Sequence, residues 1–230
     1  MAALAGIDFT ILQGYNNLLI EGNSLVSILA INNQNLFTEW TIAPIIANIQ
    51  AIDTLTPNQS FKDGQFLVSK EKNFELGFFS PGNSSNRYLG IRFFKVKEQT
   101  LVWVANRNDP INGSAGSVLS IDQRGNLVLY DRYNRSLWFT NVSVQGTIST
   151  VAQLLDTGNL VLVDREDSKR ILWQSFDYPT DTSLQGMKLG LNRKTGLDRF
   201  LISWKSENDP GTGHSLYKIS PAKLWFTPAT

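Results

Sequence analysis

Cysteine is absent from this 230-residue sequence, and histidine occurs once, at His214. The missing cysteines exclude disulfide bonds, thiol nucleophiles and thiolate zinc sites. One histidine cannot supply the several imidazoles of a histidine-based metal site. We therefore expect no metal and no cofactor, and a core large enough to fold without disulfide bonds.

Positive charge is missing from the start of the sequence, because all 21 lysines and arginines lie at or beyond Lys62. A secretory signal needs a basic beginning and an unbroken apolar run, but the runs Leu25–Ile31 and Thr41–Ile49 have no basic flank and the second contains Pro44. No run reaches the ~18 apolar residues of a membrane span. Two interpretations of residues 1–50 stay open: a degraded signal region, whose best remnant is Thr41–Ala51, or an unrelated N-terminal exon.

The remaining composition favours a globular β-protein that does not catalyse a reaction. Hydrophobic residues make up 42% of the chain, and frequent Gly, Asn and Ser are typical of all-β folds with many turns. A net charge of +1 gives no field for nucleic acid. Phosphate-binding glycine loops and a kinase catalytic loop are missing, and a Ser-His-Asp triad would depend on His214 alone. A glycosidase-type carboxylate pair is left open, because spacing along the chain does not give spacing in space.

Tryptophans at 103, 138 and 173 recur at a spacing of 35 residues. Repetition at such a period indicates repeated structural units. The second and third units share GNLVL, at 125–129 and 158–162, then an Asp-Arg pair and a Leu-Trp pair. Gly-Asn is turn chemistry, and LVL is typical of a strand that is apolar on both faces. We expect three antiparallel sheets around an axis, with Trp103, Trp138 and Trp173 in the structural core.

The motifs LVWVANRNDPI, LLDTGNLVLVD, ILWQSFDYPTDTSLQGMKLG and LISWKSENDPGTG make the sequence recognisable. It resembles the ectodomain of the plant S-domain (G-type lectin) receptor-like serine/threonine kinases over roughly residues 52–218. The resemblance implies an all-β, three-fold β-prism of the bulb-type mannose-lectin kind at residues 51–181. Residues 182–230 would be the truncated start of a second β-module of the S-locus glycoprotein region, cut before the Cys-rich modules and the kinase. Because the sister sheets of that module are missing, we expect the segment after residue 180 to pack poorly or to lean on the first prism.

Bulb lectins bind mannose with the pattern Gln-x-Asp-x-Asn-x-Val-x-Tyr, in which alternate residues share one face of a strand. In the second repeat Asn126, Val128 and Tyr130 match the pattern, whereas Asp122 and Arg124 replace Gln and Asp. Arg124 reverses the charge and removes an acceptor for sugar hydroxyls. We therefore assign Asn126, Val128 and Tyr130 as a degenerate carbohydrate site, whose alternative is a purely structural role.

The other two repeats match less well. In the third repeat only Asn159 and Val161 fit the pattern, because Val163 replaces its tyrosine. The first repeat, near Gly90–Phe93, shows no match. The second repeat is therefore the candidate site.

Five Asn-x-Ser/Thr sequons predict surface positions for N-glycans if the chain is exported. They lie at Asn58, Asn83, Asn112, Asn134 and Asn141. Together these features predict an extracellular (apoplastic) recognition module of a receptor-like kinase, with a glycan, peptide or protein ligand and a homo- or hetero-dimer through the lectin domain as partners. A free mannose-binding lectin and a non-functional gene fragment are the alternatives.

Overall fold

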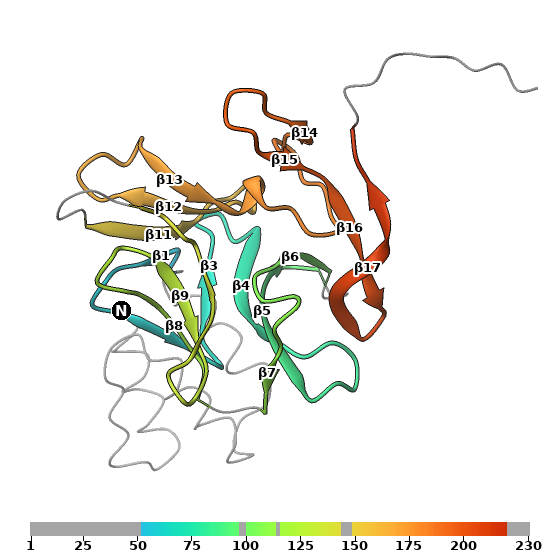
Figure 1. Ribbon diagram of the computed structural model, residues 1–230. Helices are drawn as coiled ribbons and strands as arrows, with labels where there is room; N and C mark the ends of the chain where they lie inside the picture. Colours follow the sequence, from blue (N-terminus) through green and yellow to red (C-terminus); the bar gives the residue numbers. More distant parts are fainter. Residues whose placement is uncertain (1–51, 97–99, 114–115, 144–148, 220–230) are drawn as a thin grey trace, which may run out of the picture. The chain divides into compact units, whose positions relative to one another are not determined.

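The computed structural model describes residues 52–96, 100–113, 116–143 and 149–219, and these are almost entirely strands and turns (Figure 1). The regular helical element among them is the 3-10 turn η1, Ser175–Asp177. The segment 1–50, with its two interpretations, lies outside the described residues. The predicted all-β class is confirmed.

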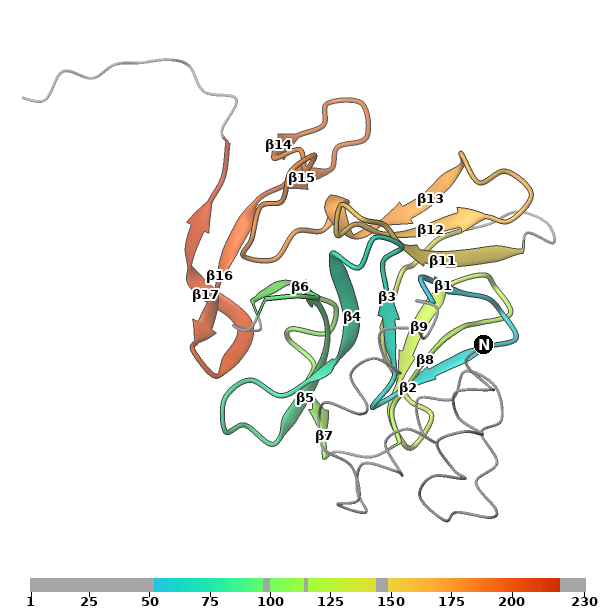
Figure 2. The ribbon, with the colours of Figure 1, turned by 180° about the vertical axis from the view of Figure 1, so that it is seen from behind.

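Three antiparallel sheets surround one core (Figures 1 and 2). The first sheet has the order β3-β4-β5-β6, with β7 pairing with β5; the second has the order β10-β9-β8-β2; the third has the order β1-β11-β12-β13. The strands are β1 (Thr54–Leu55), β2 (Ser60–Lys62), β3 (Phe66–Val68), β4 (Phe74–Phe79), β5 (Asn86–Phe93), β6 (Leu101–Val104), β7 (Ile111–Asn112), β8 (Val118–Ile121), β9 (Leu127–Tyr130), β10 (Ser136–Phe139), β11 (Thr150–Leu154), β12 (Leu160–Asp164) and β13 (Ile171–Gln174).

The Gly-Asn pairs form matching turns before β9 and β12. Gly125 and Gly158 have φ angles of 78° and 81°, a left-handed conformation that favours glycine. The turn at Gly158 is also crowded, since a Cβ there would lie 2.8 Å from a side-chain carbon of Leu184 and 2.9 Å from one of Phe74. The repeated glycine is therefore favoured by backbone geometry in both repeats.

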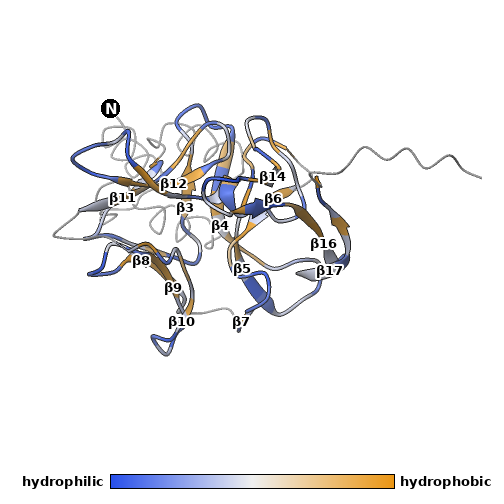
Figure 3. Ribbon diagram, turned by 45° about the horizontal axis from the view of Figure 1, so that its top comes forward, coloured by the Kyte–Doolittle hydropathy of each residue, from blue (hydrophilic) through white to orange (hydrophobic). Residues whose placement is uncertain are grey.

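Each sheet turns an apolar inner face toward the axis and contributes one tryptophan to it. Orange, apolar residues occur along many of the strands, interspersed with white and blue ones, and many of the turns are blue (Figure 3). Trp103 of β6, Trp138 of β10 and Trp173 of β13 meet edge to face, with ring centroids 5.8, 6.0 and 5.5 Å apart. Trp103 and Trp173 are buried, whereas Trp138 is only partly buried. The indole N–H of Trp103 donates to the carbonyl of Tyr178 at 2.8 Å, so this buried donor is satisfied.

Two hairpins follow the three sheets. They consist of β14 (Gly190–Leu191) with β15 (Asp198–Arg199), and β16 (Leu201–Ser206) with β17 (Asp209–Tyr217). Trp204 of β16 packs against Phe79, Tyr88 and Val104, which lie on the outer face of the first sheet. The segment after residue 180 thus leans on the prism. Its assignment as the start of a second module stays a prediction.

Arg107 fastens the hairpin β16-β17 to the end of the first sheet. Its Nε donates to the carbonyl of Pro210 at 2.8 Å, and its Nη2 donates to the carbonyls of Ser203 at 2.9 Å and Ile202 at 3.2 Å. Burial lowers the pKa of the guanidinium, and the nearby charge of Asp181 opposes that shift. A partly buried cation that serves main-chain acceptors is costly to replace, because each acceptor would lose its partner.

Candidate functional site

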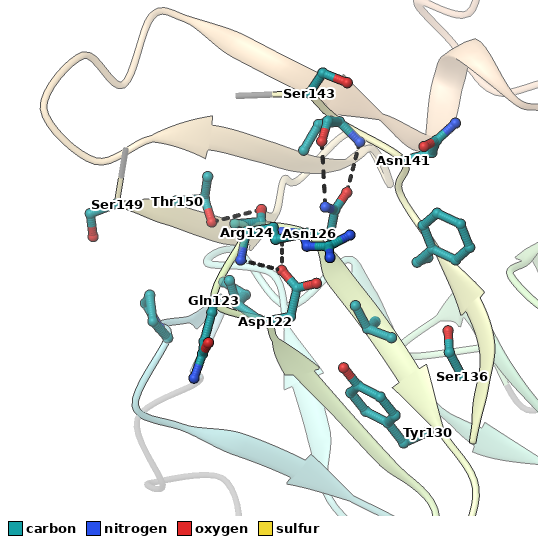
Figure 4. Close-up of a pocket in the computed structure, with 16 residues that line it drawn as sticks. Asp122, Gln123, Arg124, Asn126, Tyr130, Ser136, Asn141, Ser143, Ser149 and Thr150 are labelled. Carbon is teal, nitrogen blue, oxygen red and sulfur yellow. Dashed lines mark hydrogen bonds between the residues drawn. The ribbon is translucent and has the colours of Figure 1, made fainter. Parts of the chain in front are cut away.

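A pocket of about 950 Å³ lies on the outer face of the second sheet (Figure 4). Antiparallel pairing builds its floor, since Tyr130 of β9 lies opposite Val118 of β8 and Ser136 of β10. Side chains that alternate along β9 then point to one side, and the Gly-Asn turn closes one end. The residues matching the sugar pattern are therefore brought together at one pocket.

Asn126 lines this pocket, but its amide group is engaged by the chain itself. Its Oδ1 accepts the backbone N–H of Val142 at 2.7 Å and the hydroxyl of Thr140 at 3.2 Å, and its Nδ2 donates to the carbonyl of Val142 at 3.4 Å. The side chain ties the start of β9 to the segment after β10. These hydrogen bonds give Asn126 a structural role in the second sheet.

Asn159 of the third repeat makes the same kind of clasp. Its Oδ1 accepts the hydroxyl of Ser175 at 3.1 Å and the N–H of Phe176 at 3.2 Å, and its Nδ2 donates to Gln174 Oε1 at 2.9 Å. The same hydroxyl groups accept the next backbone N–H in each repeat: Thr140 Oγ1 accepts that of Leu127, and Ser175 Oγ accepts that of Leu160. The repeated asparagine is thus a structural residue in both units.

Val128 and Tyr130 differ in what they offer a ligand. Val128 is 3% exposed and forms part of the pocket floor. Tyr130 is partly exposed, and within the described part of the chain its hydroxyl makes no hydrogen bond. Of the three assigned residues, Tyr130 has the polar group most available to a ligand.

The turn before β9 supplies the two charged groups of the pocket. Asp122 Oδ1 accepts the backbone N–H groups of Arg124 at 2.9 Å and of Asn126 at 2.8 Å, which fixes the turn (Figure 4). Thr150 of the third sheet braces the same turn by donating to the carbonyl of Gly125 at 2.9 Å. Arg124 is exposed and lines the pocket, and among the described residues it makes no ion pair. A fixed turn therefore presents a guanidinium that is unpaired among the described residues.

The far end of β9 is fixed by Asp131. Its carboxylate accepts the N–H groups of Tyr133 and Arg135, each at 2.9 Å, and the guanidinium Nε of Arg135 at 2.8 Å. Burial alone would raise the pKa of this carboxyl, but the donors outweigh it and the pKa lies below its ordinary value. Tyr130 is thus held between two ordered turns.

Two rim residues escaped the site assignment. Phe139 and Asn141 both line the pocket, and Phe139 is 51% exposed. The sequence analysis assigned Asn141 only as a sequon. Phe139 follows Trp138 on β10, so that Trp138 faces the core and Phe139 faces outward. Alternation after the tryptophan is the signal that could have found Phe139.

All five sequon asparagines are exposed in the structure: Asn58, Asn83, Asn112, Asn134 and Asn141. Their side chains are therefore accessible to modification, which remains a prediction.

His214 is exposed on β17. The described residues contain no group of three or more histidines, aspartates or glutamates placed to hold a metal ion. No helix in the described part of the chain is long and apolar enough to cross a membrane.

The outer faces of the other two sheets lack the features of the second. In the third sheet Val161 and Val163 are 2% and 8% exposed, and Val163 has no hydroxyl where the second repeat has Tyr130. In the first sheet the outer face is covered by Trp204 and the hairpin that carries it. The second repeat thus has the pocket together with a tyrosine hydroxyl that makes no hydrogen bond to the described residues.

Comparison with known proteins identifies the kind of protein that this chain resembles. A family model described as D-mannose binding lectin matches residues 100–205. The chain is 48% identical over 171 residues to the G-type lectin S-receptor-like serine/threonine-protein kinase RKS1 of Arabidopsis thaliana, covering 74% of this chain and 20% of that protein. It is 46% identical over 179 residues to the S-locus-specific glycoprotein S6 of Brassica oleracea, covering 76% and 41%.

Among solved structures, the chain is similar to the monomeric mannose-binding lectins from Gastrodia elata. The identity is 22% and the TM-score 0.40, with 54% of this chain and 96% of that chain covered. The chain spans less than half the length of the curated relatives named here.

Proposed function

This chain is homologous to the G-type lectin S-receptor-like kinases and the S-locus glycoproteins, and from that premise we propose that it is an extracellular recognition module that binds a carbohydrate. The observation that carries the proposal is the pocket of about 950 Å³ with the exposed ring of Phe139 and the hydroxyl of Tyr130, which makes no hydrogen bond to the described residues. Polar groups that converge beside an aromatic surface are typical of sites for hydroxylated ligands. The matched region belongs to a lectin family and not to an enzyme family.

A glycan array with the full chain and two tyrosine variants tests this function. We expect Tyr130→Ala to lose glycan binding, because it removes both a hydroxyl and an apolar wall. Tyr133→Ala is the matched control, since Tyr133 is 64% exposed in the next turn and does not line the pocket. A folded chain that binds no glycan, or whose binding survives Tyr130→Ala, would contradict the proposal.

A peptide or protein ligand is the second candidate. A smaller pocket of about 360 Å³ lies beside the three axial tryptophans, and Tyr178 and Phe139, each 51% exposed, lie along it. Exposed aromatic rings are enriched where proteins meet. If the protein partner is a second copy of this chain, the dimer would show as self-association in sedimentation velocity, and Tyr178→Ser would weaken that self-association. A monomer at every concentration would count against the dimer.

A further inference from the structure

We propose that the pocket on the second sheet selects a sugar that carries a carboxylate, such as a uronic acid residue of a polysaccharide, with the guanidinium of Arg124 as the partner of that carboxylate. The inference rests on the proposed function, that this pocket binds a carbohydrate. It adds the chemical class of the sugar.

The first support is the state of Arg124. Five other arginines pair with carboxylates of the chain: Arg87 with Asp63, Arg92 with Glu75, Arg135 with Asp131, Arg170 with Asp164 and Arg199 with Asp177. Arg124 makes no such pair within the described residues, although it lines the pocket of about 950 Å³. A guanidinium forms two parallel hydrogen bonds with a carboxylate and cannot lose its charge at ordinary pH.

The second support is the anchoring of the turn that carries this side chain. The N–H of Asp122 donates to the carbonyl of Asn126 at 2.9 Å, and the N–H of Gly125 donates to the carbonyl of Asp122 at 3.0 Å. Together with the carboxylate of Asp122, these bonds hold the backbone of Arg124 at the pocket edge. Little backbone ordering is then needed when a ligand binds, which favours affinity.

The third support is that the remaining groups suit a hydroxylated ring and not a bare anion. Asp122 uses only Oδ1 in the turn, and its Oδ2 has no hydrogen-bond partner among the described residues, so it can accept from sugar hydroxyls. Tyr130, Ser136 and Asn141 can donate or accept, and Phe139 offers an apolar surface. Because Asp122 and Arg124 balance each other, the pocket lining has no net charge that would attract polyanions in general.

Arg124 also explains why a neutral sugar is a poorer fit. A guanidinium has five donors and no acceptor. In the mannose pattern an aspartate stands at position 124 and accepts hydrogen bonds from sugar hydroxyls. With Arg124 in its place, a neutral sugar finds no acceptor there. A uronate instead supplies the acceptor itself, so the same substitution that weakens a neutral sugar strengthens an acidic one.

Calorimetry with a short oligogalacturonate and its fully methyl-esterified form tests the inference, because esterification removes the negative charge and keeps the same sugar backbone. We expect the full chain to bind the acid form more tightly. Arg124→Gln should weaken that binding about tenfold, the loss of one charge-assisted pair, and Arg124→Lys should weaken it less. Arg193→Gln is the control, since Arg193 is exposed and does not line the pocket. Unchanged thermal unfolding would show that the variants are folded.

Three results would overturn the inference. Equal binding of the esterified form, insensitive to Arg124→Gln but lost in Tyr130→Ala, would sink the acidic preference while leaving the carbohydrate site intact. An equal loss in Arg193→Gln, with competition by polyglutamate, would show general attraction of anions. Absence of binding to both probes and to every glycan on the array would remove the proposed function together with the inference.

Discussion

The outer face of the first sheet is covered by a hairpin, and we call it the closed face; the outer face of the second sheet holds the pocket, and we call it the open face. On the first sheet Phe79, Tyr88 and Val104 are buried beneath Trp204 of the hairpin β16-β17. On the second sheet the corresponding surface is open and holds the pocket with Tyr130 and Arg124. Both sheets nevertheless present a similar apolar inner face and one tryptophan to the axis. The inner faces determine the fold, and the outer faces are free to take different roles.

The largest expected effect is on the closed face. Trp204→Ala should lower the free energy of unfolding by about 3 kcal/mol, because it uncovers an apolar surface and leaves a cavity. Guanidinium denaturation and hydrogen exchange of β16 and β17 would measure it. Tyr217→Ala is the control on the same hairpin, since Tyr217 is 62% exposed. An unchanged stability would mean that the hairpin does not close the first sheet.

A somewhat smaller effect is expected from the two clasping asparagines. Asn126→Ala and Asn159→Ala should each cost about 2 kcal/mol, because buried N–H and hydroxyl partners lose their acceptor. Equal losses in urea denaturation would place both residues in the same structural role. If Asn126→Ala kept full stability and lost only ligand binding, Asn126 would instead be a ligand-contacting residue.

The pH dependence of the open face follows from Asp131. Its pKa is lower in the folded chain than in the unfolded chain, so its stabilising contribution is present above the unfolded pKa and is lost as the pH falls through the folded pKa. We expect Asp131→Asn to flatten the acid limb of the stability curve, measured by thermal unfolding across acidic pH. A limb of unchanged steepness would show that the turn after β9 does not depend on this carboxylate.

The smallest expected effect concerns sugar attached to the chain itself. If the exported chain is glycosylated, Asn141→Gln should increase ligand binding modestly, because Asn141 lies at the pocket edge. Asn134→Gln is a matched control, since both asparagines are exposed sequons with positive φ, 52° at Asn141 and 61° at Asn134. Equal changes in ligand binding for the two variants would show that a glycan on Asn141 does not obstruct the pocket.

The spacing of Trp103, Trp138 and Trp173 was enough to predict three sheets around an axis, because a repeated core residue needs a repeated unit. The role of Arg107 was not predictable, since its four carbonyl partners come from strands about a hundred residues later. The alternation of residues along the strand predicted that Asn126 and Tyr130 lie on one face, and both line the same pocket in the structure. It could not reveal that Thr140 and Val142 return to occupy the amide of Asn126.

Mapping of ligand contacts by ¹H–¹⁵N NMR most directly tests the claim that the second sheet carries the binding face. The full chain would be titrated with methyl α-mannoside and, separately, with oligogalacturonate. The account predicts shifts concentrated at residues 122–130 and 136–143, with the first sheet unchanged. Shifts centred on β4, β5 and the hairpin β16-β17, or on the third sheet, would contradict it.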